Sequence, residues 1–164
     1  INNVLADITT QYSARLAADV ASKITDIDLS KVDIFYNVIT NASVVAGGSA
    51  GSAMAVSTIV ALENKELKPG VVVTGSIDEK GNIVSAGGIR EKAKAAKSRG
   101  AKLFLVPKNS GEVRGYKRET ECKSYNDVVY CEVKHVTNTT DFPKDLGIEI
   151  KEVSNIKEAL EYFI

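Results

Sequence analysis

The 164-residue sequence contains one histidine, two cysteines, three prolines and no tryptophan. A metal centre built on several histidines, or a zinc module built on several cysteines, is therefore excluded by the supply of ligands. Basic and acidic side chains are equal in number, 21 of each, so the formal net charge is zero. Because nucleic-acid-binding domains usually carry a basic excess or a basic stripe, we expect no nucleic-acid partner.

Long apolar segments are also missing from the sequence. No run of about 18 or more apolar residues occurs, so no membrane-spanning helix is predicted. The first residues lack a basic region followed by an apolar stretch, and they do not resemble a signal peptide. Asn-Xaa-Ser/Thr patterns at Asn41 and Asn138, together with the two cysteines, favour a membrane-associated or extracytoplasmic setting, with the cytoplasm as the alternative.

Cys122 and Cys131 are nine residues apart in a polar segment. If this segment folds as a hairpin, the two cysteines could form a disulfide bond across it. Two free thiols are the alternative, and the sequence leaves the choice open.

The length predicts one domain over residues 1–164. Hydrophobic periodicity and turn residues predict helices over 4–24, 49–63, 89–99 and 155–164, the last capped by Ser154, and strands over 32–38, 71–77, 83–85, 102–106 and 148–153. Between about 108 and 145 the sequence is polar, and we expect an irregular excursion apart from a strand over 127–133. This order is typical of an α/β fold, here an α+β arrangement of a mixed sheet with flanking helices.

A run of small residues, from Gly47 to Gly51, opens the second predicted helix. Glycine allows tight turns, and a helix start presents free N–H groups. A phosphate-binding loop would need a lysine after the second glycine, where this sequence has Ser52. Two interpretations remain: a loop that only caps a buried helix, or a nucleophile at Ser49, which lies in a Gly-Xaa-Ser-Xaa-Gly pattern.

A serine nucleophile needs a base that removes its proton. His135 is the only imidazole in the sequence, and with Asp127 it would complete a Ser-Asp-His triad. A single histidine in a polar segment is equally typical of an ordinary surface residue with no catalytic role.

Lys92 is the other candidate base. On a helical wheel Ile89, Ala93 and Ala96 lie within about 40° of one another, and Lys92 falls beside Ala96 rather than on the charged side. Such a lysine either extends its ammonium group to solvent or acts as a base, which requires burial that lowers its pKa from about 10.4 toward 7–8. Thr74, a polar residue in a valine-rich strand, is its candidate companion.

Together these motifs resemble the proteolytic domain of the Lon protease family. The matches are Gly-Gly-Ser-Ala-Gly at 47–51, Thr-Gly at 74–75, Gly-Gly-Ile-Arg-Glu-Lys at 87–92 and Leu-Val-Pro-Lys at 105–108. The 43-residue separation of Ser49 and Lys92 is the spacing associated with this family. Ala46 replaces an acid found in many members, and Phe35 and Asn37 replace histidines, so the sequence is more similar to divergent archaeal-type members.

The resemblance implies a serine endopeptidase that hydrolyses peptide bonds with a Ser-Lys dyad, on a fold related to the ribosomal protein S5 domain 2-like fold. Ser49 would be the nucleophile, and Lys92 the general base and then the general acid. Thr74 would hold the lysine in place. Backbone N–H groups of Gly48, Ser49 and Ala50 would form the oxyanion hole. No metal is implied.

The resemblance also implies partners. Lon proteases act on proteins, assemble as rings that are commonly hexamers, and couple this domain to an ATPase. No nucleotide-binding loop occurs in these residues, so we expect no cofactor in this domain. ATP would act only through an ATPase segment absent from this chain, if one exists, and an ATP-independent relative is the alternative. The alternatives are a serine esterase that uses Ser49, Asp127 and His135, or a non-catalytic Lon-like module.

Overall fold

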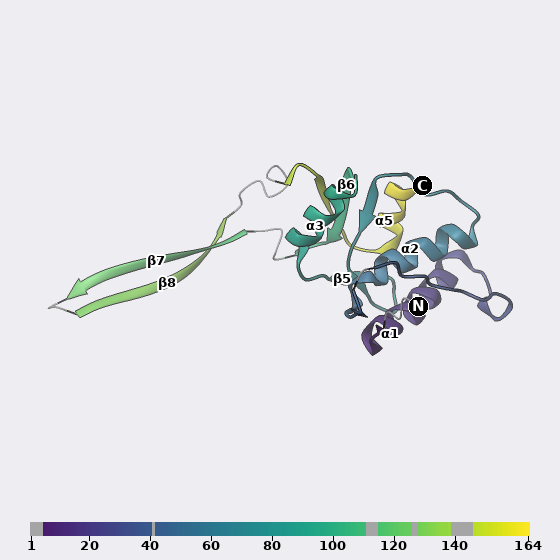
Figure 1. Ribbon diagram of the computed structural model, residues 1–164, viewed down its shortest axis with the longest axis horizontal. Coiled ribbons are helices and arrows are strands. Elements are labelled where there is room, and N and C mark those ends of the chain that lie inside the picture. Colours follow the sequence, from purple (N-terminus) through teal and green to yellow (C-terminus); the bar gives the residue numbers. More distant parts are fainter. Residues whose placement is uncertain (1–4, 41, 111–114, 126–127, 139–145) are drawn as a thin grey trace.

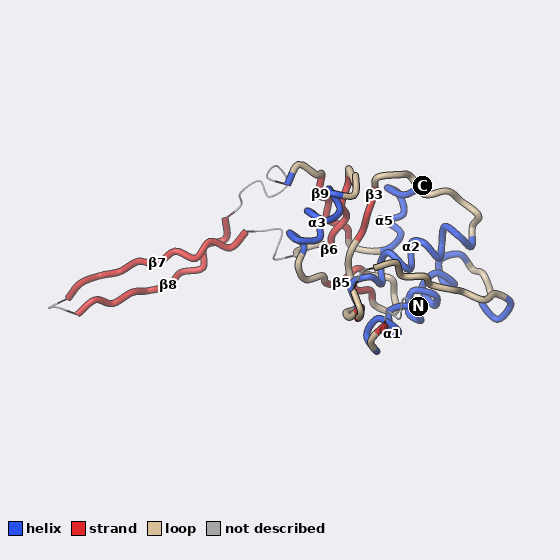
Figure 2. Tube along the Cα trace, in the orientation of Figure 1, coloured by secondary structure: helices blue, strands red, loops and turns tan. Residues whose placement is uncertain are grey.

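The computed structural model describes residues 5–40, 42–110, 115–125, 128–138 and 146–164 (Figures 1 and 2). The described chain combines helices and strands in a mixed order, which confirms the predicted α/β class. Helices surround a small central sheet, and a long hairpin projects away from this body (Figure 1). Among the described residues, every helix is too short or too polar to cross a membrane.

The central sheet has three parallel strands in the order β3 (Val71–Val73), β6 (Leu103–Pro107) and β9 (Glu149–Val153). Helix α3 (Ile89–Ser98) covers one face, and α2 (Gly51–Leu62) and α5 (Ile156–Phe163) lie on the other (Figure 1). Side chains of β6 alternate between the two cores. Phe104 and Val106 pack with the buried residues of α3, and Leu105 packs with those of α2 and α5. Because both faces are covered, the strand is almost wholly apolar.

Helix α1 (Ile8–Thr25) packs against α2 and begins after Asp7. The Asp7 carboxylate accepts a hydrogen bond from the Thr10 N–H at 2.8 Å, as expected of a helix cap. At the other end of the chain, the prediction that Ser154 caps the last helix is wrong by one residue. The Asn155 side chain accepts the Glu158 N–H, and the Glu158 carboxylate in return accepts the Ser154 N–H.

The remaining strands pair in twos and do not join the central sheet. Strand β1 (Leu5–Ala6) is parallel to β2 (Val44–Val45), and β4 (Ser76–Ile77) is antiparallel to β5 (Ile83–Ser85). The expected single mixed sheet is therefore wrong for the described residues, whose strands form four separate sheets. Gly75 explains why β3 and β4 belong to different sheets, because its φ of +153° turns the chain between these two strands.

The predicted strand over 32–38 is also wrong. Residues 32–40 have no regular structure (Figure 2) and follow a short 3-10 turn, η1 (Leu29–Lys31). Alternating apolar residues predict a strand, but a strand needs a neighbour, and Phe35 and Ile39 remain 90% and 91% exposed. Tyr36 ties the segment to α2, because its hydroxyl lies 2.7 Å from that of Thr58. Burial raises the pKa of this tyrosine.

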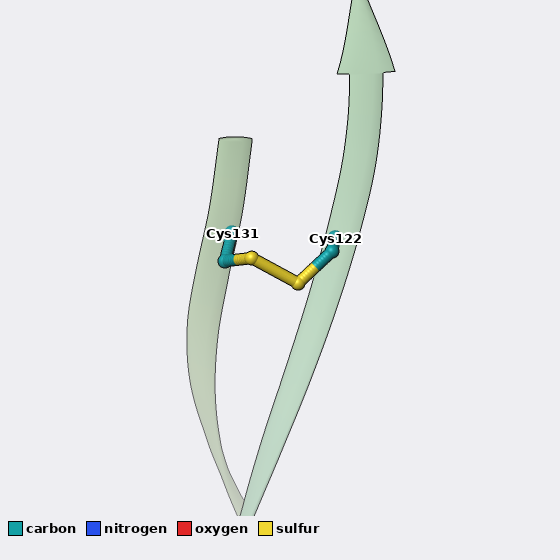
Figure 3. The surroundings of a disulfide bond; sticks show 2 residues. All are labelled: Cys122 and Cys131. Atoms are coloured by element: carbon teal, nitrogen blue, oxygen red, sulfur yellow. A yellow bond between two sulfur atoms is a disulfide. The ribbon is translucent and has the colours of Figure 1, made fainter. Parts of the chain in front are cut away.

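The polar excursion is regular where an irregular segment was expected. Strands β7 (Gly115–Tyr125) and β8 (Val128–Asn138) pair antiparallel along their whole length. Cys122 lies opposite Cys131, and a disulfide bond joins them (Figure 3). The strand expected over 127–133 is confirmed for its described residues, which belong to β8, whereas β7 was not predicted. Polar residues do not exclude a strand that is exposed on both faces, and composition therefore concealed β7.

Candidate functional site

Ser49 lies in η2 (Gly48–Ala50), a single 3-10 turn that leads directly into α2. Gly47 precedes this turn with a φ of +103°, a conformation that favours glycine. Ser49 is only half-buried, so its hydroxyl lies near the surface of the body. The first N–H groups of a helical turn have no acceptor within it, which leaves the N–H groups that begin η2 available to a ligand.

Lys92 lies in the second turn of α3 and points its amine at this serine. Its Nζ is 2.9 Å from the Oγ of Ser49 and 3.4 Å from the Oγ1 of Thr74. As the helical wheel predicts, Ile89 and Ala93 are buried, and Lys92 is half-buried beside them. Three residues singled out from the sequence are thus brought within hydrogen-bonding distance.

Thr74 and Gly75 follow β3 and bond the end of this strand to the loop that carries Ser49, residues 45–50, called the serine loop below. The Thr74 hydroxyl donates to the Ser49 carbonyl oxygen at 3.2 Å, and the Gly75 N–H donates to the same oxygen at 2.8 Å. The Gly75 carbonyl in turn accepts the Ser52 N–H at 2.9 Å. Thr74 itself is fixed by its N–H, which donates to Leu105 of β6 at 3.0 Å. These bonds hold the backbone of Ser49 in one position relative to the central sheet.

Three hydroxyl residues of α1 also hold the serine loop, and none was predicted from the sequence. The Thr9 hydroxyl accepts the Gly47 N–H at 2.9 Å. The Thr10 hydroxyl donates to the Val45 carbonyl at 3.2 Å, and that of Ser13 donates to the Gly48 carbonyl at 3.3 Å. One signal was present: Thr10 and Ser13 are three residues apart and lie on the buried side of an amphipathic helix, where polar residues need partners.

The hydrogen-bond network around the serine loop also includes one charged group, the carboxylate of Asp7. The Thr9 hydroxyl that accepts from Gly47 donates to the Asp7 carboxylate at 2.8 Å. The hydrogen bond from the Thr10 N–H, followed by that from the Thr9 hydroxyl, holds the pKa of Asp7 below its ordinary value. The first turn of α1 therefore acts as an anchor for the loop that carries Ser49.

Ser52, in the first turn of α2, offers a contrast. Its side chain is fully buried, and its Oγ has no hydrogen-bond partner among the described residues. Of these two serines only Ser49 lies beside an amine, so only the Ser49 hydroxyl has a candidate base next to it.

The described residues contain only part of the alternative triad. His135 is part of β8, where its backbone pairs with that of Arg118, and Asp127 lies outside the described residues. The hairpin of β7 and β8 extends away from α2 and α3 (Figure 1). The strand of His135 is thus not part of the body around Ser49.

A half-buried lysine within reach of a serine at a helix start is the arrangement typical of serine hydrolases in which lysine replaces histidine as the base. The comparison with known sequences gives the family. The model of the Lon protease (S16) C-terminal proteolytic domain matches residues 5–138. The chain therefore belongs to the Lon protease family, which confirms the resemblance seen in its motifs.

Curated relatives agree with this assignment. The archaeal Lon protease of Methanocaldococcus jannaschii is 33% identical over 115 residues, which cover 64% of this chain and 18% of the relative. The archaeal Lon protease of Thermoplasma volcanium is 28% identical over 139 residues, which cover 85% of this chain and 19% of the relative. The mitochondrial Lon protease homolog of Saccharomyces cerevisiae is 44% identical over 64 residues, or 39% of this chain and 6% of the relative. The chain thus spans about a fifth of the length of its archaeal relatives.

Proposed function

We propose that this chain is a peptidase domain that hydrolyses peptide bonds of proteins, with Ser49 as the nucleophile and Lys92 as the general base. The observation that carries the proposal is the distance of 2.9 Å between Lys92 Nζ and Ser49 Oγ. A base must lie within about 2.6–3.2 Å of the atom whose proton it removes. Membership of a family of proteolytic domains supports the same activity.

In the proposed mechanism a neutral Lys92 amine accepts the Ser49 proton while Oγ bonds to the substrate carbonyl carbon. The electron pair of the carbonyl moves to its oxygen, and backbone N–H groups of Gly48, Ser49 and Ala50 stabilise that oxyanion. The C–N bond then breaks, and Lys92 returns the proton to the leaving amine. Water hydrolyses the acyl-enzyme with Lys92 again as the base. Thr74 positions the amine throughout.

The nucleophile and the base in this mechanism are side chains of the chain itself, and the proposal includes no metal or cofactor. We extend it in three respects that follow from the family. The domain acts within a homo-oligomeric ring, any dependence on ATP comes from a separate ATPase segment, and the fold is related to the ribosomal protein S5 domain 2-like fold. Protein substrates, rather than nucleic acids, are its partners.

Hydrolysis of an internally quenched peptide by the purified chain tests the proposal. We expect Ser49→Ala and Lys92→Met each to lower kcat/KM by at least about a hundredfold, the lower range for loss of a general base. Ser52→Ala is the matched control and should retain activity, because its hydroxyl makes no hydrogen bond among the described residues. His135→Gln should also retain activity.

Two results would contradict the proposal. Unchanged hydrolysis in Ser49→Ala or Lys92→Met would show that these two residues do not form a catalytic dyad. Loss of activity in His135→Gln, with Lys92→Met still active, would instead favour the Ser-Asp-His esterase.

A further inference from the structure

The hairpin of β7 and β8 has two chemically different faces. Residues directly opposite each other in an antiparallel pair share a face, and successive residues alternate between the two faces. At residues 119–124 and 129–134 the register therefore places all the charged side chains on one face. The other face is uncharged, and it consists of the disulfide bond and four further side chains, Thr120, Ser124, Val129 and Val133.

This uncharged face is exposed to solvent in a single copy of the chain. Val129 and Val133 are 62% and 39% exposed, and the hairpin projects away from the body (Figure 1). Two strands alone are marginally stable in water, and they gain stability when an apolar face packs against another surface. The arrangement indicates that the uncharged face packs on a surface that lies outside its own copy of the chain.

A second surface without a partner lies on residues 34–40. Within the described chain, no backbone hydrogen bond joins residues 33–39 to another segment. Phe35 and Ile39 remain 90% and 91% exposed. A hollow of about 460 Å³ opens beside Ile39, between residues 36–40 and the strand pair β1 and β2, and none of its lining residues carries a charge.

The two surfaces match in chemistry but lie at opposite ends of the molecule. Both are uncharged, so their contact removes apolar area from water without burying an unpaired charge. Residues 32–40 begin after η1, at the end of the body farthest from the hairpin (Figure 1). The hairpin of one copy can therefore reach this segment in a second copy more readily than in its own. The net charge of zero adds no long-range repulsion between copies.

We propose that the hairpin is a docking arm whose uncharged face binds residues 34–40 and the adjacent hollow of a second copy of this chain. Because the contact joins two different surfaces, a pair of copies keeps one free surface of each kind, and further copies add head to tail. The contact supplies the surface that joins the copies of a homo-oligomer, and it does not depend on the peptidase activity proposed for Ser49.

Variants that place positive charge on one surface at a time test the docking. One double variant, Val129→Lys with Val133→Lys, changes the hairpin, and the other, Phe35→Lys with Ile39→Lys, changes the segment. All four side chains are exposed, so the fold should be retained. Analytical ultracentrifugation over a range of concentrations measures association. We expect the parent chain to associate, and each double variant to raise the dissociation constant by at least about tenfold, as loss of an interface hot spot does.

Mixing the two double variants distinguishes this contact from other modes of association. The unaltered hairpin of one variant can dock on the unaltered segment of the other, whereas the reverse contact carries lysines on both sides. An equimolar mixture should therefore form dimers, and nothing larger, at concentrations where each variant alone is monomeric. Contact between two identical hairpin faces would give no such rescue.

Tyr130→Lys and Val84→Lys are the matched controls. Tyr130 is 68% exposed on the charged face of the hairpin, and Val84 is 57% exposed on β5. Both variants should associate as the parent chain does.

The proposal is overturned if the parent chain stays monomeric at every concentration, if either double variant associates as the parent does, or if the mixture forms no dimers. Failure of the proposed function would look different. A chain that associates as expected but does not hydrolyse the quenched peptide would contradict the peptidase activity and leave the docking arm in place.

Discussion

Thr74 contacts both halves of the candidate dyad. Its hydroxyl lies 3.4 Å from Lys92 Nζ and 3.2 Å from the carbonyl oxygen of Ser49. A side chain placed in this way aligns the amine with the serine without reaching the substrate, so its loss should affect turnover more than binding.

Thr74→Val should therefore lower kcat by about tenfold or more while leaving KM for a peptide nearly unchanged. Thr74→Ser should restore most of the rate, because it keeps the hydroxyl. Thr58→Val provides the structural control, since Thr58 is also buried and hydrogen-bonded, on α2. Equal losses of kcat in Thr74→Val and Thr58→Val would show that Thr74 has only a structural role.

Gly75 is a second residue whose identity the site requires. A Cβ at this position would collide with the side chain of Ile83 and lie 3.2 Å from that of Pro107. Its φ of +153° adds backbone strain for any other residue.

Gly75→Ala should lower the free energy of unfolding by at least about 1–3 kcal/mol and reduce peptidase activity, because the turn also positions Ser49. Gly87→Ala is the matched control, since a Cβ at Gly87 would meet no atom within 4 Å. Urea titration of the two variants measures the difference. A loss of stability in Gly87→Ala as large as in Gly75→Ala would contradict the explanation.

At the scale of elements, the first turn of α1 anchors the loop that carries Ser49 through Asp7 and Thr9. The Asp7 pKa is lowered in the folded state by these hydrogen bonds. A lowered pKa means that the carboxylate stabilises the fold above its unfolded-state pKa, and that this contribution is lost as the pH falls through the folded-state value.

The parent chain should consequently lose more stability than Asp7→Asn as the pH falls from about 5 to 2. Asp19→Asn, on an exposed position of the same helix, is the control and should follow the parent. Thermal unfolding at a series of pH values measures the slopes. Parallel curves for the parent and Asp7→Asn would show that Asp7 contributes no pH-dependent stability.

The hairpin of β7 and β8 raises a different question, because two strands alone are marginally stable in water. Its ion pairs from Lys134 to Glu121 and Glu132, at 3.1 and 3.6 Å, are exposed and add little stability. The disulfide between Cys122 and Cys131 is then the main constraint on the described part of the hairpin.

Replacing both cysteines by serine should speed amide exchange in β7 and β8 by at least about tenfold, because the crosslink limits the open states of the hairpin. Exchange in α2 and β6 serves as the internal control and should not change. Unaltered protection of the hairpin would show that it does not depend on the disulfide.

Elements with a buried face were predictable, and exposed ones were not. The apolar stripes of α1 and α3 and the apolar run of β6 located them to within a few residues. Residues 32–40 and the hairpin gave opposite errors. Alternation predicted a strand over 32–38 that has no neighbour, whereas the polar sequence concealed β7 and most of the length over which it pairs with β8. A strand depends on its partner, which sequence periodicity does not show.

The candidate site divides in the same way. Ser49 was predicted because it lies in a Gly-Xaa-Ser-Xaa-Gly pattern at a helix start. Lys92 and Thr74 were predicted because each departs from the pattern of its own element, and the structure brings all three together. The contacts of Thr9 and Ser13 were not, because their partners are backbone groups of a loop more than thirty residues away, and backbone groups leave no mark on a sequence.

At the scale of the whole molecule, the central sheet explains why the two halves of the dyad meet. Lys92 comes from α3, on one face of the sheet, and Ser49 precedes α2, on the other (Figure 1). Residues from opposite faces of an open sheet can meet beyond the end of a strand or around an edge strand. Thr74 lies directly after β3, which is at the edge of this sheet. This placement at the carboxyl end of a parallel strand is common for sites in α/β folds.

In the proposed mechanism Lys92 activates Ser49. The rate at which a small phosphonate ester labels Ser49, followed by intact mass and peptide mapping over a range of pH, tests this activation. We predict that Ser49 is labelled, that the rate falls as the solution is acidified because a protonated lysine cannot accept a proton, and that Lys92→Met slows labelling by at least about a hundredfold. No labelling of Ser49, or an equal rate in Lys92→Met, would contradict the claim.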